Sequence, residues 1–170
     1  SGPTPRILDI GRYDGKLLNE LAAIFPKANL VGYDIADNVL PDSSNRSGIE
    51  YVSTDECLFE QPYDIVIYSH SISYIPNIAS QISQIRSCLT SNGYVFVQMP
   101  DITKNPYYGL MGDQLYTFTP FALTKFLNAQ GFYVKKIDCK QFPREYMVVA
   151  GNNFKSNCDN VIEQDSLDYL

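Results

Sequence analysis

Short apolar runs alternate with amphipathic stretches along the chain up to residue 100. The apolar runs predict five strands, at residues 6–10, 28–35, 49–53, 63–69 and 94–99. Residues 16–26 and 77–89 predict helices, because their apolar positions recur every three or four residues. The second of these helices carries its apolar stripe on Ile78, Ile82, Ile85 and Leu89. Strands that alternate with helices in this way are typical of a parallel sheet covered by helices.

The pattern changes after residue 100. Residues 119–131 predict a helix, with Thr119 as N-cap, Pro120 at the first position and Gly131 at the C-terminal end. Residues 132–152 predict two strands, and their connection at 142–144 is so short that they must be antiparallel. The fold class that follows is α/β: a Rossmann-like, seven-stranded, mostly parallel sheet with helices on both faces and a C-terminal antiparallel hairpin.

The remaining segments are expected to be irregular. They are residues 38–48, with room for at most one helical turn, the turn 91–93 and the loop 101–116. At 170 residues the chain fits one domain, which we place at residues 5–152, followed by a polar, acidic tail at 153–170.

Composition excludes several classes of partner. A net charge of −6 and an isoelectric point near 4.6 argue against nucleic-acid binding. No apolar run approaches the roughly 18 residues that a membrane span needs, and no signal peptide precedes the first strand, so we expect no membrane partner and a cytoplasmic location. The four cysteines lack metal-like spacing, which predicts reduced thiols and no metal site.

The candidate chemistry begins where the first strand turns into the first helix, in the stretch LDIGRYDGKLL at residues 8–18. Dinucleotide loops have the pattern G-x-G-x-x-G, whereas Gly11 and Gly15 here enclose three residues with Tyr13 at the place of the middle glycine. Asp9 and Asp14 would disfavour a pyrophosphate but suit a ligand with a cationic amino-acid end. Arg12 is expected to point to solvent, and Tyr13 to lean away from the ligand cavity.

The second predicted strand ends at Asp34, 19 residues after Gly15. An acidic side chain there can accept hydrogen bonds from both hydroxyls of a ribose, which is a feature shared by methyl-donor and NAD enzymes. Asp34 alone therefore leaves both ligands open, as well as a purely local role in a turn or helix cap.

Several segments together resemble the class I S-adenosylmethionine-dependent methyltransferases. These are the loop above, VGYDIADN, YDIVIYSHSISYIPN, IRSCLTSNGYVFVQMPD and LYTFTPFALTKFLNAQGF, which together span roughly residues 6–151. The loop is most similar to the form found in methyltransferases of nucleotide-linked sugars. The His-Glu-His segment that those proteins often carry is replaced here by MGDQLYTFT at residues 111–119.

The resemblance implies the class I methyltransferase fold and S-adenosylmethionine as cofactor. The cofactor-binding residues that it implies are Asp9, Gly11, Tyr13, Gly15, Asp34, Ile35, Asp55, Glu56 and Ser69. His70, the single histidine, follows the fourth strand, where such enzymes place residues that face both donor and acceptor. It is the candidate catalytic base, because an imidazole has a suitable ordinary pKa.

We therefore expect transfer of a methyl group to a small polar acceptor, such as a sugar or another biosynthetic metabolite. Tyr74 and the 101–116 loop would form the acceptor wall. The alternative is a non-catalytic module with a methyltransferase fold in a larger protein. An NAD-dependent oxidoreductase fits less well because of the loop spacing and the terminal hairpin. A homodimer or additional domains in the full-length protein are left open.

Overall fold

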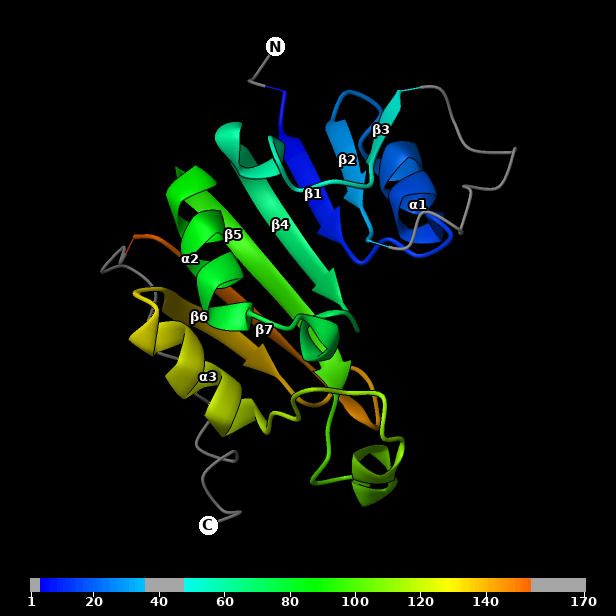
Figure 1. Ribbon diagram of the computed structural model, residues 1–170, viewed down its shortest axis with the longest axis vertical. Coiled ribbons are helices and arrows are strands. Elements are labelled where there is room, and N and C mark those ends of the chain that lie inside the picture. Colours follow the sequence, from blue (N-terminus) through cyan, green and yellow to red (C-terminus); the bar gives the residue numbers. More distant parts are fainter. Residues whose placement is uncertain (1–3, 36–47, 154–170) are drawn as a thin grey trace.

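A seven-stranded sheet, in the order β3-β2-β1-β4-β5-β7-β6, forms the centre of the computed structural model, which describes residues 4–35 and 48–153 (Figure 1). The strands are β1 (Arg6–Ile10), β2 (Asn29–Tyr33), β3 (Ile49–Val52), β4 (Tyr63–Ser69), β5 (Leu89–Pro100), β6 (Tyr133–Asp138) and β7 (Glu145–Gly151). The first five pair in parallel, whereas β7 is antiparallel to both β5 and β6. The predicted fold class is confirmed.

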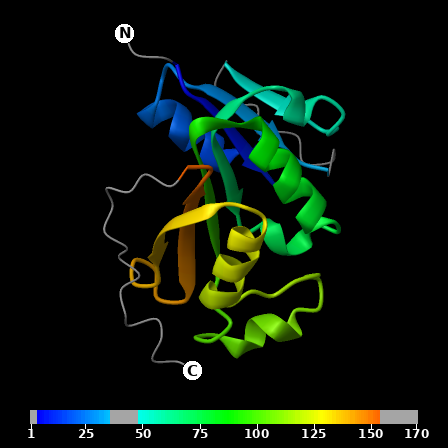
Figure 2. The ribbon, with the colours of Figure 1, turned by 90° about the vertical axis from the view of Figure 1, so that its left-hand side faces the viewer.

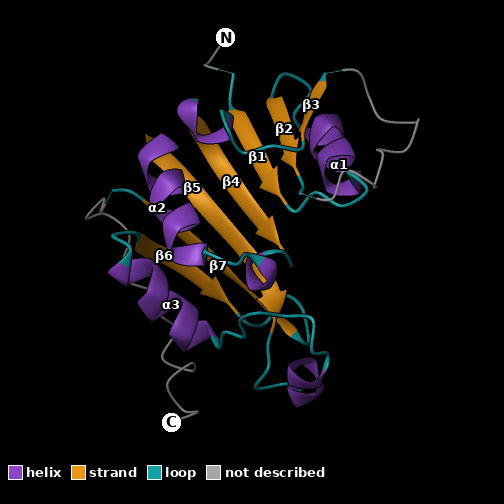
Figure 3. Cartoon of the chain, viewed as in Figure 1, coloured by secondary structure: helices purple, strands orange, loops and turns teal. Residues whose placement is uncertain are grey.

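The helices lie on both faces of the sheet, as Figures 2 and 3 show. They are α1 (Lys16–Ile24), α2 (Ile78–Cys88) and α3 (Pro120–Ala129), with 3-10 turns η1 (Leu58–Glu60), η2 (Ile72–Tyr74) and η3 (Pro106–Leu110). The predicted caps of α3 are present, since Thr119 Oγ1 accepts a hydrogen bond from the Ala122 amide at 3.1 Å and Gly131 follows the helix at φ +83°.

The two faces bury unequal amounts of apolar surface. On one face, the apolar stripes of α2 and α3 pack against the large core cluster, with Ile82, Ile85, Leu123 and Leu127 fully buried. On the other, Leu18 of α1 packs against a smaller cluster of Ile7, Leu30 and Ile67. Beside α1, among the described residues, the sheet keeps an apolar groove of about 540 Å³ over β4, β5, β7 and β6. Its apolar lining includes Leu17, Leu21, Ile65, Ile67, Phe96, Met147 and Val149.

Several predicted bounds differ from the structure by a few residues, and the start of β5 differs most. Residues 91–93 were expected to form a turn before a strand at 94, but β5 already begins at Leu89. Tyr63 of β4 pairs with Leu89, and Ile65 pairs with Tyr94, so the residues between Leu89 and Tyr94 form an irregularity within the strand. The polar residues signalled the irregularity correctly, and pairing with β4 on both sides of it keeps the segment in the sheet. The predicted irregular segment 38–48 lies almost wholly, and the tail after residue 153 entirely, outside the described residues.

The topology places one end of each strand at a common edge. The carboxyl ends of the parallel strands β1 to β5 all lie along this edge. The antiparallel β7 begins there, with Glu145 opposite Pro100 of β5. Ligands of open α/β sheets bind at this edge. No helix in the described parts of the chain is long and apolar enough to cross a membrane.

Candidate functional site

The turn between β1 and α1 has an unusual backbone. Gly11, Tyr13 and Gly15 all have positive φ, at +81°, +47° and +76° respectively. Gly11 and Arg12 donate their amides to the Tyr33 carbonyl of β2, which holds the turn against the neighbouring strand. Tyr13 is 67% exposed, so its ring stands in solvent. A tyrosine in this left-handed region is strained, because its Cβ crowds the backbone.

Both glycines of the turn face protein side chains. A Cβ on Gly11 would lie 2.3 Å from the Cβ of Ser71, which follows β4. Ser71 Oγ in turn donates a short hydrogen bond to the Ile10 carbonyl. A Cβ on Gly15 would lie 3.0 Å from the Tyr51 hydroxyl. The two glycines thus leave room for side chains that come from β3 and from the residues after β4 to pack against the turn. The spacing of the glycines in the sequence did not reveal this packing.

Arg12 is buried, at 7% exposure, which overturns the expectation that it points to solvent. The aliphatic part of its side chain crosses β2 above Gly32. A Cβ added to Gly32 would lie 2.8 Å from the Arg12 Cδ. The guanidinium lies 4.9 Å from the centre of the Tyr51 ring and donates to the Tyr13 carbonyl at 2.9 Å. Gly32 pairs with Asp9 on one side and with Tyr51 on the other, so Arg12 covers a row of three positions across the sheet.

Asp9 lies beneath the turn and is 2% exposed. Burial, together with the nearby Asp34 carboxylate, raises its pKa to about 7, although Arg12 acts in the opposite direction. Its Oδ1 is buried without a hydrogen-bond partner among the described residues. An orphaned carboxylate oxygen of this kind fits a hydrogen-bond donor or a cation brought by a ligand.

The acids predicted to hold a nucleoside lie on the same edge. Asp34, directly after β2, accepts a hydrogen bond from the Tyr13 amide at 3.0 Å. Both Asp34 and Asp55 are close enough to Tyr33 to add to the effect of burial, which raises the pKa of that phenol. Glu56 and Ile35 are exposed, Ile35 at 82%. Asp34 therefore lies at the β1–α1 turn, and the charges of Asp34 and Asp55 both act on the Tyr33 phenol.

His70 belongs to a cluster that sequence reasoning missed. It follows β4 with φ +58°, a left-handed conformation that is rare for a residue with a side chain. Its Nε2 lies 3.5 Å from Glu145 Oε2, and the same oxygen accepts a hydrogen bond from Gln98 Nε2 at 2.6 Å. The His70 amide also donates to the Gln98 carbonyl, at 2.9 Å. Ser69 lies one residue earlier, in the lining of the apolar groove with Gln98.

The residues after β5 cover the edge beyond His70. Asp101, 2% exposed, accepts hydrogen bonds from the Thr103 amide and hydroxyl, at 3.0 and 2.6 Å, and so fixes the start of this loop. The amides of Leu115 and Tyr116 donate to the Ser73 carbonyl, and the Tyr74 hydroxyl lies 3.5 Å from Asp113 Oδ2. The end of the loop is therefore bonded to η2, and Asp101 has a structural role at its start; the acceptor wall stays a prediction.

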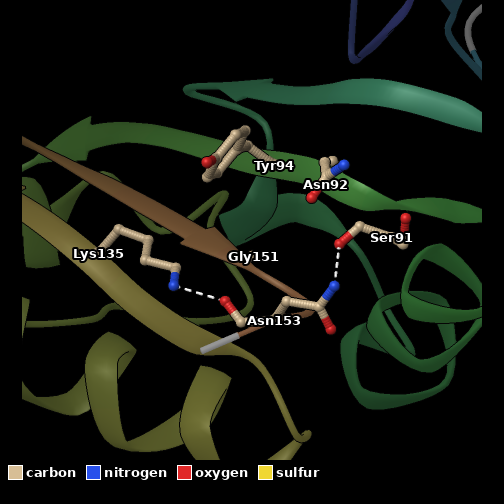
Figure 4. A pocket seen from close by; sticks show the side chains of 7 residues that line it. Ser91, Asn92, Tyr94, Lys135, Gly151 and Asn153 are labelled. Atoms are coloured by element: carbon tan, nitrogen blue, oxygen red, sulfur yellow. Dashed lines mark hydrogen bonds between the residues drawn. The ribbon is translucent and has the colours of Figure 1, made fainter. Parts of the chain in front are cut away.

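A second hollow lies at the opposite edge of the sheet (Figure 4). There, Asn153 Nδ2 donates to the Ser91 carbonyl and Lys135 Nζ to the Asn153 carbonyl. Its volume of about 10 Å³ holds about one water molecule, so it offers no ligand site. Within the described residues, no group of three or more His, Cys, Asp or Glu side chains is placed to hold a metal ion. Cys57, Cys88 and Cys139 are free thiols.

Comparison with known proteins identifies the family. A family model described as "Methyltransferase domain" matches residues 2–137. The chain belongs to this family. The domain is therefore a methyltransferase domain. Its cofactor is S-adenosylmethionine, the methyl donor of the enzymes that it resembles, and we expect it at the carboxyl edge of the sheet.

Curated relatives are similar over part of the chain. Trans-aconitate 2-methyltransferase of Acidovorax sp. (strain JS42) is 29% identical over 115 residues, which cover 65% of this chain and 45% of the relative. Malonyl-[acyl-carrier protein] O-methyltransferase of Bacillus cereus is 22% identical over 93 residues, or 52% of this chain and 35% of the relative. The matched region spans less than half the length of these relatives.

Solved structures share the fold. An S-adenosylmethionine-dependent methyltransferase from Archaeoglobus fulgidus superposes with a TM-score of 0.69 and 19% identity, covering 86% of both chains. Human N-acetylserotonin methyltransferase, solved in complex with S-adenosylmethionine, gives 0.72 and 17%, covering 88% of this chain and 48% of the human one. The methyltransferase domain thus has the expected architecture over nearly all of its described length.

The residues at the carboxyl edge of the sheet fit the donor. Asp34 provides a carboxylate at the end of β2, and an acidic side chain in this position can accept hydrogen bonds from ribose hydroxyls. Asp9 keeps an orphaned oxygen beneath the turn, and Asp55 and Glu56 follow β3 at the same edge. This set of acceptors and negative charge suits a ligand that carries hydroxyl groups, an amino group and a sulfonium.

Proposed function

We propose that the protein transfers a methyl group from S-adenosylmethionine to a small polar acceptor, such as a sugar or another biosynthetic metabolite. The observation that carries the proposal is the common location of two groups of residues. Asp9 and Asp34 lie at the β1–α1 turn, Asp55 lies near Tyr33 of β2, and His70 follows strand β4, which is adjacent to β1, at the same edge. The residues that we assign to the donor and to the acceptor are therefore neighbours.

The chemistry divides between the donor and the chain. When bound, the donor supplies a methyl group already activated by its sulfonium. The protein then has to hold the ribose with Asp34, complement the cationic end with Asp9 and orient the acceptor, because positioning provides much of the rate acceleration. His70 takes the proton of an acceptor that must lose one.

The charge at the edge favours some acceptors over others. The relatives are named for trans-aconitate and for a malonyl group on acyl carrier protein, both of which are carboxylic acids. Here Asp34, Asp55, Glu56, Asp113 and Glu145 all contribute carboxylates near the edge. Like charges repel, so we propose a neutral or cationic acceptor instead of a polycarboxylate.

Calorimetric titration with S-adenosylhomocysteine, and separately with NAD, tests the proposal. Binding of the first without the second supports it, whereas binding of NAD alone would replace it with an oxidoreductase. Ser71 lies so near Gly11 that a Cβ added there would be 2.3 Å from the Ser71 Cβ. This leaves little room for a ligand against that glycine and favours one second candidate, a non-catalytic methyltransferase-fold module. Absence of binding to either compound would support that candidate. A homodimer and a cytoplasmic location stay predictions.

A further inference from the structure

The cluster of His70, Glu145 and Gln98 combines three strands of the sheet. His70 follows β4, Gln98 lies in β5 and Glu145 begins β7. Because β7 is antiparallel to β5, its first residue arrives beside the last residues of β5, at the edge where β4 also ends. The parallel pairing of β4 with β5 and the reversed direction of β7 thus bring together His70 and Glu145, which lie 75 positions apart in the sequence.

We propose that Glu145 is the positioning residue for His70, and that the acceptor is consequently a compound with an O–H or N–H group that loses its proton during transfer. This inference rests on the proposed function. Glu145 Oε2 lies 3.5 Å from His70 Nε2, and Gln98 Nε2 donates to the same oxygen at 2.6 Å. Gln98 therefore fixes the carboxylate, and the carboxylate faces one ring nitrogen.

The arrangement determines the role of each imidazole nitrogen. A carboxylate beside Nε2 favours a proton on that nitrogen and leaves Nδ1 with a free lone pair. The proton of the acceptor passes to Nδ1, and the bonding electrons stay on the acceptor oxygen or nitrogen, which becomes the nucleophile. The imidazolium that results lies against the Glu145 carboxylate. Glu145 is the only acidic side chain within 4.0 Å of His70 among the described residues.

Two features favour a role for the cluster in the reaction. The left-handed backbone of His70, at φ +58°, costs free energy that a glycine would avoid, yet a histidine occupies the position. The His70 side chain is also 42% exposed, so its ring is accessible to a reactant from the edge. An acceptor that is already an anionic carboxylate would need no such base.

The single histidine makes a direct test available. Diethyl pyrocarbonate acylates an unprotonated imidazole nitrogen, and mass spectrometry of the His70 peptide at pH 8 would follow this adduct separately from adducts on lysine, cysteine or tyrosine. We expect Glu145→Gln to slow acylation by roughly threefold, the size of a partly exposed ion pair. Glu145→Asp should restore part of the rate. Glu20→Gln, which makes the same change of charge on the exposed side of α1, is the matched control and should react like the wild type.

Gln98→Ala gives a second line of evidence, because it frees the Glu145 carboxylate without removing any charge. It should slow acylation less than Glu145→Gln does. Circular dichroism and calorimetry with S-adenosylhomocysteine, measured on every variant, separate this inference from the proposed function. An unchanged or faster acylation in folded Glu145→Gln overturns the role of Glu145, whatever the donor titration shows. If the wild type does not bind S-adenosylhomocysteine, the proposed function is overturned, whereas the acylation result still stands.

Discussion

Replacing Asp9 by Asn should change how stability depends on pH. Asp9 is 2% exposed, and burial, with the Asp34 charge, raises its pKa from 3.8 to about 7. Because the folded state holds this proton more tightly than the unfolded state, Asp9 contributes stability below pH 3.8 that is lost as pH rises to about 7. The pKa of Asp9 thus differs by about three between the folded and unfolded states, which corresponds to roughly 4 kcal/mol of stability at about 1.36 kcal/mol for each pKa unit.

The assay is urea unfolding followed by circular dichroism at pH 4 to 8. The free energy of unfolding of Asp9→Asn, minus that of the wild type, should increase by up to about 4 kcal/mol from pH 4 to pH 8, because Asn cannot ionise. Asp138→Asn is the control: hydrogen bonds from the Gln141 and Lys140 amides lower the pKa of Asp138 to about 2, so its difference should be flat over the same range. A flat difference for Asp9→Asn as well would refute the burial argument.

Three further changes test other parts of the site. Asp34→Ala should weaken S-adenosylhomocysteine binding by about 1.5–3 kcal/mol in calorimetry, the range of a charge-assisted hydrogen bond, and normal affinity in the folded variant would remove Asp34 from the ribose site. Tyr13→Gly should change the free energy of donor binding by less than about 1.4 kcal/mol. It should raise the free energy of unfolding by roughly 1 kcal/mol, because glycine tolerates φ +47°. If the wild type does not bind the donor and the variant does, the Tyr13 side chain blocks the donor site. Gly32→Ala should lower stability by about 1–3 kcal/mol, since its Cβ would lie 2.5 Å from Leu18 Cδ1 and 2.8 Å from Arg12 Cδ. Adding Arg12→Ala should recover part of that loss, and additive losses would contradict the contact.

Local sequence patterns predicted most of the fold, since strand alternation, helix spacing and caps depend on near neighbours. The β4 bounds at 63–69 and the Thr119 cap are examples. The burial of Arg12 was not predictable, because it depends on a glycine in the next strand and a tyrosine in the one beyond. Glu145 was missed for a similar reason, since only the register between β5 and β7 brings it to His70.

The bare part of the sheet affects how this domain is studied in solution. Dyes that fluoresce on apolar surfaces are commonly used to detect loosely packed states, because such states expose buried side chains. In the described structure, the groove beside α1 presents Ile65, Phe96 and Val149 to a volume of about 540 Å³ while the fold is intact. Native protein is therefore expected to bind such a dye. Since the sequence contains 13 tyrosines and no tryptophan, near-ultraviolet circular dichroism of tyrosine is the safer probe of its tertiary packing.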